Sequence, residues 1–185
     1  GNPDDIAPIQ YYLKERVSVG DVKVEIYDAE GKLVQSIPGT KRKGINKVYW
    51  NLRYTPPRTA TGGSKMDYGG FIAPLVQPGT YTVKLKVGSK EYSEPLVMVH
   101  DANNKKFTEE DQQQQYKTAM NLYHMHEQLA DLVNKINADQ KMVKDNMATV
   151  KNPQNKKLIV EYNIKLETLR ATLLATKHTS IFADE

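Results

Sequence analysis

The sequence predicts an α+β fold in which an antiparallel β-sandwich is followed by a long antiparallel α-helical hairpin. Strand-like alternation of apolar and polar residues occupies the first half of the chain, at 22–35, 44–52 and 77–87. Two apolar stripes with helical spacing occupy the second half. The composition also changes between the halves, because no glycine follows Val99 and Pro153 is the only later proline. Strand-type sequence therefore gives way to helix-type sequence near residue 100.

Three segments follow from this change in pattern. Residues 1–8 are expected to be disordered or a linker, 9–100 to form the β-sandwich, and 101–185 to form the helical hairpin. A chain of 185 residues is long enough for one domain or two small ones. The hydrophobic content of 39% and charged content of 26% are typical of a globular protein.

The strands are predicted from residues that alternate between the two faces of a sheet. A leading strand is expected at 9–13, and Val22, Val24 and Ile26 alternate with polar neighbours, as in a sheet with one buried face. The turn at 28–31 ends in a glycine that can take a positive φ. Val48, Trp50 and Leu52 share the buried face of a later strand, so Trp50 is expected in the core. The same alternation recurs at Tyr81, Val83, Leu85 and Val87.

The strand pattern is interrupted by a long insertion loop at 54–77. This loop contains three glycine or proline pairs with apolar and aromatic residues between them. Loops of this length are uncommon inside a compact domain and are either functional or loosely ordered. The apolar residues predict that the loop docks, either onto the sandwich itself or onto a neighbour.

Two helices are predicted at about 108–150 and 154–177. Thr108 is the expected N-cap of the first helix, and the acids at 109–111 suit the positive end of a helix. The turn at Asn152-Pro153 separates the helices. Mutual packing of two apolar stripes would then cover each helix with the other. The stripes are Leu122, Met125, Leu129, Leu132 and Ile136 in the first helix, and Ile159, Tyr162, Leu166, Leu169 and Leu173 in the second.

The net charge of +4 lies entirely in residues 1–100, because residues 101–185 carry equal numbers of acids and bases. Lys41-Arg42-Lys43 is expected at a hairpin tip. Such a tip could touch an acidic partner, although a solvated surface explains it more simply. We predict no nucleic-acid partner.

Cysteine content and hydropathy limit the kinds of site and the membrane topology but leave the compartment open. The chain contains no cysteine, which excludes disulfides and thiolate metal sites. No apolar run approaches the length of a membrane span, and no signal peptide opens the chain, so we predict no membrane insertion. Gly1-Asn2 suggests a fragment of a longer protein.

Three motifs could suggest catalysis or a cofactor, and each has a simpler explanation. Two histidines separated by Met125 face different sides of a helix, whereas a helical metal pair needs a spacing near four. The acids at 109–111 are explained by helix capping. Gly62-Gly63-Ser64-Lys65 lacks the spacing of a phosphate-binding loop. The sequence therefore predicts no catalytic residue, no metal and no cofactor.

Aromatic residues outside the expected core are the remaining candidates for an interaction surface. Exposed rings can stack on sugars or anchor protein partners. The ordinary alternative is packing within the long loop. The candidates are Tyr49, Tyr54, Tyr68 and Phe71.

Two resemblances extend these predictions. The IYD-x-x-G turn, the G-x-N-x-V-x-W strand and the P-G-x-Y strand, within 22–35, 44–54 and 78–87, resemble the immunoglobulin-like domain of flagellar hook-capping proteins. This resemblance implies an immunoglobulin-like sandwich. The insertion at 54–77 departs from that pattern, in which the loop is short.

A second resemblance covers roughly residues 9–180. The order of the segments WNLRY, GGFIAPLVQPGTYTVKL, EYSEPLVMVHD and EEDQQQQY resembles the C-terminal tail that follows the β-propeller in bacterial sortilin-like, BNR-repeat proteins. These proteins often carry a glycosyl hydrolase label, which we do not transfer. The resemblance implies a secreted or periplasmic parent, a neighbouring propeller domain as partner, and an accessory role for this chain.

Three functional hypotheses remain. The favoured one is a non-catalytic accessory module that docks onto or braces a propeller, with the 54–77 loop and the helices as contact surfaces. The alternative is a carbohydrate-binding module of a polysaccharide-processing enzyme, which requires solvent-facing coplanar rings. An independent hydrolase is the third, and it needs two carboxylates facing each other across a cleft.

Overall fold

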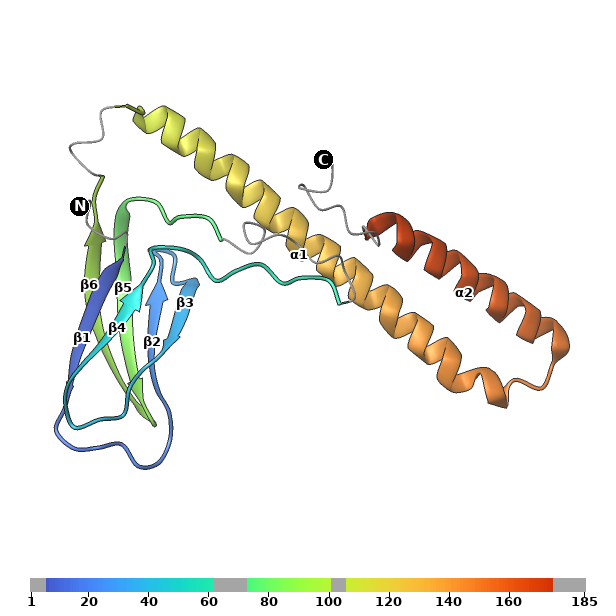
Figure 1. The fold of residues 1–185 in the computed structure, drawn as a ribbon, viewed down its shortest axis with the longest axis horizontal. Coiled ribbons are helices and arrows are strands. Elements are labelled where there is room, and N and C mark those ends of the chain that lie inside the picture. Colours follow the sequence, from blue (N-terminus) through green and yellow to red (C-terminus); the bar gives the residue numbers. More distant parts are fainter. Residues whose placement is uncertain (1–5, 62–72, 101–105, 175–185) are drawn as a thin grey trace, which may run out of the picture. The chain divides into compact units, whose positions relative to one another are not determined.

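The computed structural model describes residues 6–61, 73–100 and 106–174. Within these ranges the chain forms two antiparallel sheets, then a long helix and a second helix (Figure 1). The α+β class predicted from the sequence is therefore confirmed.

The described residues form six strands, and some strands that pair are not consecutive in the chain. β1 and β4 form a two-stranded sheet, and the second sheet has the order β3-β2-β5-β6. All pairs are antiparallel. The strands are β1 Ala7–Leu13, β2 Val22–Tyr27, β3 Leu33–Pro38, β4 Gly44–Trp50, β5 Gly79–Val87 and β6 Lys90–Met98.

Both sheets contribute side chains to the hydrophobic core. Trp50 of β4 is fully buried, and its ring meets that of Tyr81 edge-on at 5.6 Å between centroids. The indole N–H donates to the Arg53 carbonyl at 3.0 Å, so the buried polar atom is satisfied. The core position predicted for Trp50 is confirmed. The other buried members of the cluster are Val24, Ile26, Val34, Val48 and Val76.

The turn between β2 and β3 forms as predicted. Gly31 has a φ of +77°, which residues with a Cβ rarely adopt. Its amide donates to the Asp28 carbonyl at 3.1 Å, and the Asp28 carboxylate accepts from the Lys32 amide at 2.7 Å. This local hydrogen bonding reverses the chain where the strand alternation stops.

The first helix begins at the N-cap that the sequence predicts, and the second begins at the predicted break, Asn152-Pro153. α1 covers Glu109–Asn146, and the Thr108 hydroxyl accepts from the Asp111 amide while the Asp111 carboxylate accepts from the Thr108 amide. A short 3₁₀ turn, η2, covers Met147–Thr149. α2 covers Pro153–Leu173, with Asn152 accepting from the Gln154 amide at 2.8 Å. α2 runs back antiparallel to the end of α1 (Figure 1), and Gln140 donates to Glu167 at 3.0 Å.

The two predicted stripes are covered only in part, since Ile136 is buried and Leu129, Ile159, Leu166 and Leu173 are half-buried. The buried residues of α1 are Ala130, Val133 and Ile136, and α2 has none. Of the predicted stripes, Leu122, Met125, Leu132, Tyr162 and Leu169 are exposed. Each predicted stripe therefore has both covered and exposed members, a difference that the spacing of the apolar residues alone does not decide.

The described ends of the 54–77 loop pack on the strands. Arg53 and Leu75 form an isolated antiparallel bridge, and the Tyr54 amide donates to the Pro74 carbonyl at 3.1 Å. Ala73 and Val76 are buried. Docking of this loop onto the strands thus holds for its described C-terminal end, while 62–72 lies outside the described residues.

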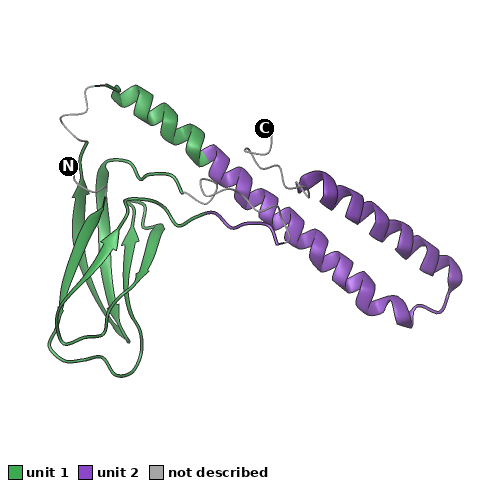
Figure 2. Cartoon of the chain, viewed as in Figure 1, with its two compact units in different colours: residues 1–56, 73–120 green, residues 57–72, 121–185 purple. Residues whose placement is uncertain are grey.

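The chain divides into two compact units, 1–56 with 73–120 and 57–72 with 121–185 (Figure 2). The first unit contains the strands and the start of α1, and the second contains the rest of α1 and α2. The predicted segments 1–8, 9–100 and 101–185 stay a prediction.

Candidate interaction surfaces

The outward side of the two-stranded sheet exposes two aromatic rings and an isoleucine. Tyr12 pairs with Ile45 across the strands, and Tyr49 pairs with Pro8. Tyr12, Ile45 and Tyr49 are 65%, 78% and 59% exposed. Since directly paired residues share a face of an antiparallel sheet, these side chains lie on one surface. We call this surface the outer β1–β4 face; it consists of Pro8, Gln10, Tyr12, Ile45, Lys47 and Tyr49.

A lysine lies beside one of the rings on this face. The Lys47 ammonium is 5.8 Å from the centroid of the Tyr49 ring, within the range of a cation–π contact. Lys47 pairs with Gln10, and this polar pair separates the Tyr12–Ile45 pair from the Pro8–Tyr49 pair. The face therefore alternates apolar and hydrogen-bonding groups along its length.

Basic loops flank the end of the face where Tyr12 and Ile45 lie. Lys14 and Arg16 follow β1, and Lys41-Arg42-Lys43 precedes β4. The Val17 amide donates to the Lys41 carbonyl at 3.0 Å, so the two loops are joined. Residues 10–21 and 40–49 together contain six cationic side chains and two acidic ones.

A buried asparagine shapes the second of these loops. Asn46 is 5% exposed, and its amide nitrogen donates to the carbonyls of Arg42 and Gly44 at 2.8 and 2.9 Å. The Tyr11 hydroxyl donates to the Thr40 carbonyl at 2.7 Å. These bonds tie the loop backbone to β1 and β4. The basic side chains therefore extend from a backbone that hydrogen bonds hold in place.

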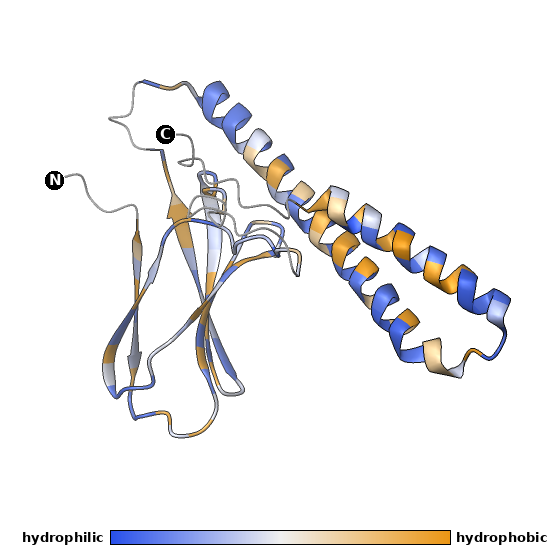
Figure 3. Cartoon of the chain, turned by 45° about the vertical axis from the view of Figure 1, so that its right-hand side comes forward, coloured by the Kyte–Doolittle hydropathy of each residue, from blue (hydrophilic) through white to orange (hydrophobic). Residues whose placement is uncertain are grey.

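Both helices carry exposed apolar stripes, seen as hydrophobic segments along them in Figure 3. Leu122, Met125 and Leu132 share one side of α1, because their spacings of three and seven residues correspond to about one and two helical turns. Leu158, Tyr162 and Leu169 share one side of α2 in the same way. These six side chains are between 43% and 62% exposed. We call these two sets the α1 stripe and the α2 stripe.

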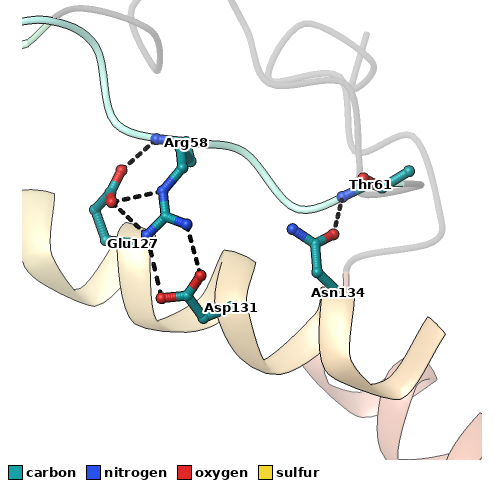
Figure 4. Close-up of polar contacts among 5 residues, drawn as sticks. All are labelled: Arg58, Thr61, Glu127, Asp131 and Asn134. Atoms are coloured by element: carbon teal, nitrogen blue, oxygen red, sulfur yellow. Dashed lines mark hydrogen bonds and ion pairs between the residues drawn. The ribbon is translucent and has the colours of Figure 1, made fainter. Parts of the chain in front are cut away.

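A strap formed by residues 57–61 runs along α1 (Figure 4). The Arg58 guanidinium contacts Glu127 and Asp131 at 2.7 Å, and the Arg58 amide donates to Glu127. Farther along, the Thr61 amide donates to Asn134 at 3.4 Å, and Asn137 donates to the Thr61 carbonyl at 3.2 Å. The Arg58 guanidinium holds the pKa of the Glu127 carboxyl below its usual value. The strap anchors the start of the 54–77 loop to α1.

The two predicted aromatic candidates that the structure describes, Tyr49 and Tyr54, differ in their surroundings. Tyr49 is exposed on the outer β1–β4 face, whereas Tyr54 packs against the core, where its hydroxyl bonds the Tyr116 hydroxyl at 2.8 Å. Burial, with this bond, raises the pKa of Tyr54. Tyr68 and Phe71 lie outside the described residues.

Sequence reasoning missed Tyr12 and Ile45 as surface residues. The signal was present, because Tyr12 alternates with Tyr11 and Leu13, and Ile45 has the opposite parity to Val48 and Trp50. What the sequence alone did not give is the pairing of β1 with β4, which brings the two side chains together.

The described residues contain no candidate metal cluster, and a hollow in the first unit has a mixed lining. No group of three potential metal ligands occurs in the described part of the chain. Among the described residues that line a hollow in the first unit, Glu109 is the only carboxylate, whereas glycoside hydrolysis needs two. Neither described helix is long and apolar enough to cross a bilayer. The other residues around the hollow are Gln77, Pro78, His100, Gln113, Tyr116 and Lys117.

Comparison with family models, with curated proteins and with solved structures finds no match to this chain. The two resemblances therefore stay predictions.

Proposed function

We propose that this chain is a non-catalytic accessory module that docks onto a neighbouring domain of a larger protein. In keeping with the resemblance to bacterial sortilin-like proteins, the neighbour would be a β-propeller, and the parent would be secreted or periplasmic. The two sheets would pack as an immunoglobulin-like sandwich, whose shared core of Trp50, Tyr81 and Val24 supports that arrangement.

The observation that carries the docking proposal is the exposed apolar surface of the helices. Three large side chains in each stripe remain about half exposed, although helix stability in proteins depends mainly on packing of an apolar face. A helix surface of this kind is typical of an interface separated from its partner. The α1 and α2 stripes are therefore the proposed contact surfaces.

The test is binding in trans to the domain encoded next to this chain in the same reading frame. Leu158→Ser/Tyr162→Ser removes two members of the α2 stripe. Lys157→Ser/Glu161→Ser is the matched control, because it changes two exposed residues of α2 at the same spacing, one position earlier. Calorimetry should give binding by the parent chain and the control, and at least about tenfold weaker binding by the stripe variant.

Two results would reject the docking proposal. One is a neighbouring domain that does not bind this chain at all. The other is equal affinity for the stripe variant and its control. A neighbour that binds through the stripe but has another fold would reject only the propeller assignment.

Carbohydrate binding is the second candidate function, and a different observation favours it. Tyr12 and Tyr49 expose their rings on one sheet face with Gln10 and Lys47 between them. Aromatic faces with nearby hydrogen-bonding groups suit sugar rings, which have apolar faces and polar edges. A glycan array with Tyr12→Ala/Tyr49→Ala beside the parent chain tests it, and binding that does not depend on these rings would reject this site.

A further inference from the structure

We propose that the outer β1–β4 face, with the basic loops at its end, binds an acidic polysaccharide, a linear polymer that contains uronic-acid sugars. This inference rests on the second candidate function and adds the chemical class of the ligand. It is independent of the docking role assigned to the helices.

The two rings provide separated stacking positions. Tyr12 pairs with Ile45, and Tyr49 lies four residues farther along β4, which corresponds to about 13 Å along the strand. A linear polymer that spans both rings passes over the Gln10–Lys47 pair. Amide and ammonium groups at this position can hydrogen-bond to hydroxyl and carboxylate groups of the chain.

The charge around the face selects an anionic polymer. Of the six cations in residues 10–21 and 40–49, only Lys41 forms an ion pair within the described part of the chain, with Asp21 at 3.4 Å. Lys14, Arg16, Arg42, Lys43 and Lys47 are all exposed. A surface with this excess of one sign attracts a ligand of the opposite sign and is weakened by salt.

The local scaffold keeps this charge and the rings together. Asn46 ties the loop before β4, and the Val17–Lys41 bond joins it to the segment after β1. A preformed site loses little conformational freedom on binding. The hydrogen-bonding groups between the rings favour a hydroxyl-rich chain over a lipid surface, which would need only the apolar and cationic side chains.

The experiment measures binding of the whole chain to polygalacturonate and to its fully methyl-esterified form, which has the same backbone without the charge. A charge variant, Lys14→Gln/Lys43→Gln/Lys47→Gln, and a ring variant, Tyr12→Ala/Tyr49→Ala, are compared with the parent. Lys144→Gln/Lys156→Gln/Lys157→Gln is the matched control, because it removes three exposed charges elsewhere. Melting curves by circular dichroism verify that every variant is folded.

The expected result is binding to polygalacturonate that weakens about tenfold in the charge variant and about tenfold in the ring variant. The control variant should bind like the parent, added salt should weaken binding, and the esterified polymer should bind less tightly.

Equal binding of both polymers would overturn the inference and leave carbohydrate binding intact. Absence of binding to any glycan would overturn both. Binding to single-stranded DNA or anionic vesicles as tight as to polygalacturonate, and unaffected by the ring variant, would also overturn the inference, because it would indicate charge attraction alone.

Discussion

At the scale of single residues, the sheet core depends on aromatic side chains whose polar atoms are satisfied. The Tyr81 hydroxyl donates to the Gln77 carbonyl at 2.6 Å while its ring packs edge-on against Trp50. Burial raises the pKa of Tyr81 to about 12. The neutral phenol is thus the form that the folded state favours.

This pKa predicts a loss of stability in alkali. A tyrosine in the unfolded chain ionises near pH 10, so the stabilising contribution of Tyr81 is complete below pH 10 and is lost as the pH rises toward about 12. Melting followed by Trp50 fluorescence at pH 9 and pH 11 should therefore give a smaller decrease in Tm for Tyr81→Phe than for the parent. Equal decreases in the two proteins would contradict this account.

At the scale of elements, α2 contains a polar atom in an unfavourable position. The Asn163 side-chain oxygen is buried and has no hydrogen-bond partner among the described residues. Asn163 lies one turn from Ile159 and from Leu166, on the more covered side of α2. Burial of an unsatisfied amide group costs free energy.

Asn163→Leu should therefore stabilise the helices. We expect the free energy of unfolding to rise by about 1–2 kcal/mol, since the unsatisfied group is removed and leucine has the higher helix propensity. Asn155→Leu, at an exposed position of the same helix, should change it by no more than about 0.5 kcal/mol. The measurement is urea unfolding followed by helical ellipticity, and a less stable Asn163→Leu would show that this amide is already satisfied.

The strands, turns and helix starts were predictable from the sequence where residues close together in the chain determine them. Strand alternation, the Gly31 turn, the Thr108 cap and the break at Asn152-Pro153 all depend on neighbouring residues, and the structure confirms them. The covered side of each helix was not predictable, because Leu132 and Val133 are adjacent apolar residues, yet Leu132 is 43% exposed and Val133 is buried. The strap was not predictable either, because it depends on contacts between residues far apart in the sequence. Arg58 and Asp131, for example, are separated by 73 residues.

At the scale of the whole molecule, the described parts of the two compact units differ in how many apolar residues they bury. The strands share a cluster of seven buried residues that includes Trp50, whereas the buried residues of α1 are Ala130, Val133 and Ile136. Cooperative units with few buried contacts open at lower free energy. The helices should therefore be the less stable part of the isolated chain.

Two optical signals can separate the units, because Trp50 is the only tryptophan and lies in the sheet core. On heating, helical ellipticity at 222 nm should decrease before the Trp50 fluorescence changes. Coincident transitions would indicate one cooperative unit and would contradict this expectation.

The central claim is that the α1 and α2 stripes are contact surfaces of a docking module. The most direct measurement is hydrogen exchange of α2 in this chain alone and in the presence of the neighbouring domain that we propose as its partner. The account predicts that amides around Leu158 and Tyr162 exchange at least about tenfold more slowly in the presence of that domain, because docking suppresses local opening of the helix. Identical exchange in the two samples would contradict the claim, since the stripes would then remain uncovered when the domain is present.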